Sequence, residues 1–181
     1  YSVAGPARCA RFGAGLNETH LAISRALAAA VVSLGCPAEV SRGREISRPK
    51  GLPPPCLSSV TRCELTVGGR KIAGSAQRQT AAAFLQHGSL LVRPGSERIV
   101  RYLKGSWGSL ESRVTTIEGE LGAPVNDSTL RGSIVEAFSA IFEIAWEPLR
   151  LTEREREWVA ARSRDKRRET GVERLREVCS P

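Results

Sequence analysis

The sequence predicts an α+β fold in which a mixed or antiparallel sheet carries helices packed on one of its sides. Strand-like runs dominate the first half of the chain, apart from one helix, and helical patterns fill the second half. Strands that precede helices, with a hairpin in the middle, are typical of this class. Neither a G-x-G-x-x-G nor a Walker A motif occurs, so nothing indicates a nucleotide-binding βαβ unit.

The N-terminal part is expected to contain a strand over residues 1–5 and a helix over residues 17–34. Asn17 is a suitable N-cap residue, and Gly35 follows the last helical residue. Apolar residues recur at helical spacing along this helix, which indicates that one face packs on the sheet: Ile23, Leu27, Val31 and Leu34. His20 lies on the polar side of the first turn and is expected to be an ordinary surface histidine.

Gly68 and Gly69 separate two strand-like runs, residues 62–67 and 70–77. Paired glycines at such a place indicate a type I′ or II′ turn, because both central residues can adopt positive φ. Small residues fill positions 73–76 of the second run, which suggests that a ligand or another backbone approaches closely there. Residues 83–92 form a third strand-like run, which Gly88 is expected to interrupt.

The second half of the chain has helical signals. A short helix is expected over residues 97–104, and Thr115 with Glu118 has the spacing of a capping box, as does Thr152 with Glu155. Asp127–Phe142 is expected to be an amphipathic helix, whose inward residues are Leu130, Ile134, Phe138, Ile141 and Phe142. Residues 152–168 predict a highly charged, peripheral helix.

The chain is basic, with a net charge of +8, and its positive residues are nearly all arginine. Abundant Arg, Ala and Gly are typical of a GC-rich coding sequence. Aromatic residues make up only 5%, which weighs against nucleic-acid binding by base stacking. A basic surface also attracts acidic proteins. No apolar run reaches the roughly 20 residues that a membrane-spanning helix needs.

Five cysteines occur, an odd number whose spacing fits no zinc site: Cys9, Cys36, Cys56, Cys63 and Cys179. Together with the absence of a signal-peptide pattern, this favours a reduced, cytoplasmic protein with free thiols and no metal. All except Cys56 are expected to be small buried hydrophobic residues.

Cys56 follows three prolines and lies fifteen positions before Lys71 (71 − 56), with a strand and a tight turn between them. An ammonium beside a thiol stabilises the thiolate and lowers the thiol pKa from about 8.5, which makes the sulfur a nucleophile. From spacing alone, a loop cysteine and a surface lysine are the more ordinary interpretation.

The run G-R-K-I-A-G-S-A at residues 69–76, followed by H-G-S at 87–89, resembles the core motifs of the lipoate–protein ligase/octanoyltransferase superfamily. Pro-Pro-Cys56 is similar to the cysteine-dependent octanoyltransferase branch, because the ligases tend to carry Arg-Asn-Asp there. The resemblance implies that Cys56 and Lys71 are catalytic. It further implies that residues on two strands bind substrate: Gly74, Ser75, Ala76, His87 and Gly88.

The resemblance also implies the domain organisation. Residues 1–150 are expected to be a partial catalytic domain that lacks its N-terminal part, including an Arg-x-Thr-Gly-Gly acyl-binding loop. Residues 151–181 are expected to be a charged, helical C-terminal extension.

Three functions remain open on the sequence. As an octanoyltransferase, the protein moves an octanoyl group from octanoyl-acyl carrier protein, through a Cys56 thioester, to a lysine of a lipoyl domain or of glycine cleavage H protein, without a cofactor. As a lipoate ligase, it uses ATP, Mg²⁺ and lipoate, and Lys71 holds a lipoyl-adenylate. The third is a non-enzymatic basic binding module. Pro-Pro-Cys56 favours the first over the second, and few lysines and aromatics weigh against the third.

Overall fold

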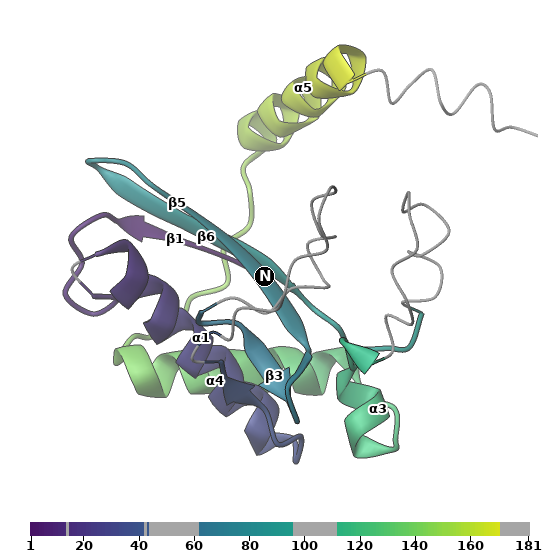
Figure 1. Ribbon diagram of the computed structural model, residues 1–181. Coiled ribbons are helices and arrows are strands. Elements are labelled where there is room, and N and C mark those ends of the chain that lie inside the picture. The colour runs from purple at the N-terminus through teal and green to yellow at the C-terminus, as the bar shows by residue number, and fades with distance from the viewer. Residues whose placement is uncertain (14, 42, 44–61, 96–111, 171–181) are drawn as a thin grey trace, which may run out of the picture. The chain divides into compact units, whose positions relative to one another are not determined.

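The computed structural model describes residues 1–13, 15–41, 43, 62–95 and 112–170 (Figure 1). The chain divides into two compact units, Tyr1–Ala145 and Trp146–Pro181. The first unit contains every strand described and three helices, and the second contains one helix. The domain boundary expected at residue 150 stays a prediction.

The strands of the first unit form two antiparallel sheets of three strands each. One sheet has the order β1 (Ser2–Pro6), β6 (Ala83–Leu90) and β5 (Ala73–Gln79); the other has the order β2 (Glu39–Val40), β3 (Leu65–Val67) and β4 (Arg70–Lys71). Ile72 lies between β4 and β5. Its N–H donates to the Leu65 carbonyl at 2.9 Å, and its carbonyl accepts from the Leu91 N–H at 2.8 Å. The run predicted as one strand is therefore shared between two sheets.

The turn between β3 and β4 is the predicted glycine pair. Gly68 and Gly69 have φ of +55° and +76°, and Val67 pairs with Arg70 on either side of them. Positive φ at both central residues defines a type I′ turn, which matches the right-handed twist of the two strands. The predicted hairpin is confirmed.

Helix α1 (Leu16–Ser33) packs against β2, β3 and β5 and against α4 (Asp127–Phe142) (Figure 1). The bounds of α4 are those predicted. The N-cap of α1 is Gly15, so the prediction of Asn17 was wrong. The helix begins earlier than expected. The backbone is already helical at Leu16, which places Asn17 within the first turn.

The core of the first unit lies between these helices and the sheets. The ring of Phe12 has its centroid 5.4 Å from that of Phe84 on β6 and 4.3 Å from that of Phe142 on α4. The predicted inward residues of α4 are buried or half-buried except Ile141, which is 43% exposed. That prediction was wrong because α1 covers only part of the apolar face of α4.

Helix α3 (Ile117–Leu121) begins at Thr116, whose hydroxyl accepts from the Gly119 N–H at 3.0 Å. The capping box predicted from Thr115 and Glu118 is therefore wrong. The Thr115 hydroxyl instead donates to Glu120, and the Glu118 carboxylate accepts from the Val125 N–H at 3.0 Å.

The second unit contains α5 (Glu153–Thr170). Its predicted capping box is confirmed, since the Thr152 N–H donates to Glu155 at 2.8 Å and the Glu155 N–H donates to the Thr152 hydroxyl at 3.3 Å. No helix within the described residues is long and apolar enough to span a membrane. The helix predicted at 97–104 lies outside the described residues.

Candidate active site

Lys71 is a buried lysine on β4, and its side chain is 1% exposed. Its ammonium lies 2.6 Å from the Glu64 carboxylate, whose side chain is 6% exposed. From spacing alone a surface position was the ordinary interpretation of Lys71, whereas the family resemblance implied a catalytic residue. The structure places it in the interior with a carboxylate as its neighbour.

The hairpin register explains why these two side chains meet. Lys71 pairs with Thr66 across the hairpin, and Glu64 stands two residues before Thr66, on the same face of its strand. Glu64 and Lys71 are therefore diagonal neighbours, a spacing that long side chains can bridge. Sequence reasoning missed Glu64, although the two-residue turn already fixed this register.

The backbone of Lys71 is held on its other side as well. Its N–H donates to the Arg113 carbonyl at 2.8 Å, and its carbonyl accepts from the Thr115 N–H at 2.9 Å. These bonds form a parallel bridge between Lys71 and Val114. Two segments distant in sequence thus fix the point from which the lysine side chain starts.

The five residues expected to bind substrate lie together on β5 and β6. Ser75 pairs with Gly88, and Ala76 pairs with His87. Because side chains alternate across a strand, the two pairs face opposite sides of the sheet. His87 and Ala76 are exposed, whereas Ser75 and Gly88 are half-buried. Gly74 lies one residue before Ser75 and is also half-buried.

Gly88 does not interrupt its strand, contrary to the expectation, because β6 continues to Leu90. A Cβ atom at Gly88 would lie 2.5 Å from the Gly74 carbonyl oxygen and 2.7 Å from the Tyr1 ring. The absent side chain therefore allows a second strand and an aromatic ring to approach closely.

A polar cluster that sequence reasoning missed lies on the buried side of this sheet. The Tyr1 hydroxyl is hydrogen-bonded to Ser75 and accepts from Gln86 Nε2 at 3.2 Å. Gln86 is fully buried, and within the described part of the chain its Oε1 atom has no hydrogen-bond partner. Gln77, its partner across the strands, also has an unpaired buried amide. Gln86 lies two residues after Phe84, on the same face of β6, which was the available signal for its burial.

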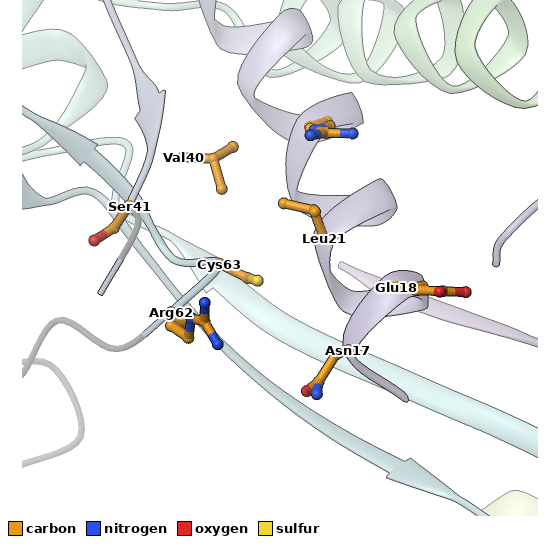
Figure 2. Close-up of a pocket in the computed structure, with 8 residues that line it drawn as sticks. Asn17, Glu18, Leu21, Val40, Ser41, Arg62 and Cys63 are labelled. Carbon is orange, nitrogen blue, oxygen red and sulfur yellow. The ribbon is translucent and has the colours of Figure 1, made fainter. Parts of the chain in front are cut away.

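A cavity of about 590 Å³ opens between the first half of α1 and the chain around β2 and β3 (Figure 2). Two arginines and one cysteine are among the eight residues that line it: Asn17, Glu18, Leu21, Arg25, Val40, Ser41, Arg62 and Cys63. Figure 2 shows the Cys63 sulfur directed towards α1. Cys63 has φ of +66°, which is uncommon for a residue with a side chain.

His20 is half-buried, not a surface residue as expected. Burial lowers its pKa from 6.5, and the nearby Glu64 carboxylate partly opposes that effect. His20 Nε2 is shielded from solvent and has no hydrogen-bond partner in the described structure. The imidazole of α1 thus lies within electrostatic reach of the Glu64–Lys71 pair.

The cysteines divide into three groups. Cys36 is buried as predicted, and burial raises its pKa. Cys9 and Cys63 are only half-buried, so the prediction overstated their burial. Cys56 and Cys179 lie outside the described residues, and the catalytic role of Cys56 stays a prediction. The cytoplasmic setting stays a prediction too.

Comparison with known proteins decides the family of this chain. The family model of the lipoyl protein ligase A/B catalytic domain matches residues 10–139. The chain belongs to this family. The superfamily expected from the G-R-K-I-A-G-S-A and H-G-S motifs is therefore confirmed.

Curated relatives of this lipoyl protein ligase A/B chain are octanoyltransferases. The chain is 36% identical over 152 residues to the octanoyltransferase LipM of Symbiobacterium thermophilum, covering 78% of this chain and 56% of that protein. It is 30% identical over 150 residues to LipM of Moorella thermoacetica, covering 78% and 55%. The chain thus spans slightly more than half the length of these relatives.

Solved structures confirm the α+β fold of the family for this chain. Lipoate-protein ligase A bound with ATP has a TM-score of 0.67 at 20% identity, covering 86% of this chain and 56% of that chain. Protein Ta0514 of T. acidophilum with bound lipoic acid has a TM-score of 0.68 at 21% identity, covering 91% and 59%.

Proposed function

We propose that the full-length protein transfers an octanoyl group from octanoyl-acyl carrier protein to a lysine of a lipoyl domain or of glycine cleavage H protein. The observation that carries this proposal is the likeness to two LipM octanoyltransferases at 30% and 36% identity. Pro-Pro-Cys56, in place of the sequence typical of ligases, supports the same branch.

In the proposed first step, the Cys56 thiolate attacks the thioester carbonyl of the donor. The carbon–sulfur bond to the carrier breaks, the carrier thiolate leaves and takes up a proton, and an octanoyl thioester forms on Cys56. In the second step, the neutral amine of the acceptor lysine attacks that thioester. An amide forms, Cys56 leaves as thiolate, and the amine releases one proton.

Residues of the hairpin and of β5 have roles in this proposal. Lys71 supplies a positive charge that favours the thiolate of Cys56. Backbone N–H groups around Gly74, Ser75 and Ala76 stabilise the oxyanion that develops on the carbonyl oxygen. His87 and Gly88, paired with Ala76 and Ser75, contribute to the acyl-binding strand.

The proposed reaction needs no cofactor, because the thioester donor is already activated. The ligase alternative would need ATP, Mg²⁺ and lipoate. The basic chain, with its net charge of +8, is proposed to favour acidic protein partners by electrostatic attraction.

The test is the intact mass of the full-length protein after mixing with octanoyl-acyl carrier protein. One octanoyl group is expected, about 126 Da, on a thioester that hydroxylamine removes. Cys56→Ser should abolish the adduct. An adduct that persists in Cys56→Ser, or transfer that requires ATP, would refute the proposal and favour the ligase.

A further inference from the structure

Glu64 is buried beside Lys71, a place where a carboxylate is costly unless it is paired. Its side chain is 6% exposed, and its Oε1 lies 2.6 Å from the Lys71 ammonium. A buried ion pair of this kind often stabilises a protein no more than apolar residues of similar size would. Stability alone therefore gives a weak reason for this pair.

The pair also lies where the chain is well fixed. The Lys71 backbone is bonded to residues 113 and 115 on one side and faces Thr66 on the other. The lysine side chain has several rotatable bonds, so the position of its ammonium depends on the groups that contact its end. The carboxylate of Glu64 meets that end by a charge-assisted hydrogen bond, which is both short and strong.

We propose that Glu64 is a positioning residue for acyl transfer, which acts by holding the Lys71 ammonium in one place through the buried ion pair. This inference rests on the proposed function, in which Lys71 takes part in the reaction. In this role Glu64 acts through Lys71 and not directly on the acyl group. It fixes the direction of the lysine ammonium, so that the positive charge is already in position when the substrate arrives.

A double-mutant cycle tests this inference. The rate of octanoyl transfer from octanoyl-acyl carrier protein to a lipoyl domain is measured in single turnovers for full-length wild type, Glu64→Gln, Lys71→Met and the double variant. Glu64→Gln keeps the shape and one acceptor but removes the charge. We expect it to slow transfer by about tenfold or more in the wild type, with little change in the half-saturating substrate concentration. In the Lys71→Met background the same change should alter the rate less than about twofold.

Two further variants complete the design. Glu64→Asp keeps a carboxylate, so it should be faster than Glu64→Gln, and it replaces Glu64→Gln in the cycle if that variant fails to fold. Glu120→Gln is the matched control. Glu120 forms an ion pair at 2.7 Å with Arg70, the residue that precedes Lys71 on β4. This variant should leave the rate within about twofold of wild type, because an ion pair whose arginine side chain is 43% exposed to solvent contributes little.

Equal losses from Glu64→Gln in both backgrounds would refute the inference, because a merely structural role does not depend on Lys71. Equal losses from Glu64→Gln and Glu120→Gln would refute it as well. A wild-type protein that transfers no octanoyl group would refute the proposed function and with it this inference. If the wild type transfers octanoyl groups but the effects of Glu64→Gln and Lys71→Met are additive, the proposed role of Glu64 is refuted and the proposed function is not.

Discussion

A Cβ atom on Gly88 would lie 2.5 Å from the carbonyl oxygen of Gly74, closer than two such atoms approach in proteins. The obstacle is backbone, which cannot rotate away as a side chain can. We expect Gly88→Ala to lower the free energy of unfolding by about 1–3 kcal/mol, because strand β5 or β6 must shift to relieve the overlap. Urea-induced unfolding followed by circular dichroism measures this loss.

Gly132 provides the matched control for that substitution. It is exposed on α4, and a Cβ atom there would meet nothing within 4 Å. Gly132→Ala should raise the free energy of unfolding by about 0.5–1 kcal/mol, because alanine favours the helix. A loss of stability in Gly132→Ala as large as in Gly88→Ala would contradict the packing described for Gly88.

Removing one partner of the buried ion pair should destabilise the protein strongly. Lys71→Met leaves the Glu64 carboxylate buried without its ammonium, so we expect a loss of about 3–5 kcal/mol in the free energy of unfolding. Adding Glu64→Gln should recover part of that loss, because the uncompensated charge is then gone. Thermal and urea unfolding measure all three variants, and a double variant less stable than Lys71→Met would be evidence against the pairing.

The half-buried imidazole of His20 should make stability depend on pH. Burial lowers the pKa of His20 from 6.5, so the unfolded chain binds a proton more readily than the folded protein near that pH. The free energy of unfolding should therefore fall as the pH drops below 6.5, towards the lower pKa of the folded state.

His20→Gln should flatten this part of the stability profile, measured by urea unfolding between pH 7.5 and about 5. The chain contains one other histidine, His87, so His87→Gln is the comparison. A profile that flattens in His87→Gln and not in His20→Gln would show that His20 is not responsible.

Lys71 should influence the reactivity of Cys56 if the proposed mechanism is right. Lys71→Ala should move the midpoint of iodoacetamide alkylation of Cys56 upward, towards the value near 8.5 of a free thiol. Peptide mapping separates the cysteines, and Cys36 is the internal reference because burial raises its pKa. An unchanged Cys56 midpoint in folded Lys71→Ala would rule out pairing between the lysine and the thiolate.

The elements that the sequence predicted well depend on local physics. The Gly68–Gly69 turn follows from the backbone freedom of two residues, and the bounds of α4 follow from an N-cap and a helical pattern. The motifs at 69–76 and 87–89 identified the family because they are short and contiguous. Each of these signals is carried by residues that are close together in the sequence.

The errors arise where distant segments decide the outcome. Ile141 is 43% exposed although it belongs to the apolar pattern of α4, because periodicity within a helix does not tell how much of its apolar face a neighbouring element covers. The Glu64 carboxylate, which sequence reasoning missed, meets the ammonium of Lys71 across the hairpin, seven positions later in the chain. His20 is half-buried because its helix packs near that same carboxylate.

The residues that flank positions 96–111 are held in place by backbone hydrogen bonds. On one side the N–H groups of Ile117 and Glu118 donate to the carbonyls of Leu91 and Val92 at 2.9 and 3.0 Å, and on the other Arg113 and Thr115 bond to Lys71. Loop-closure entropy grows only slowly with length, by about 0.6 kcal/mol for each doubling. Insertions or deletions between residues 96 and 111 should therefore leave Lys71 in place, because the flanking hydrogen bonds do not depend on the number of residues between them.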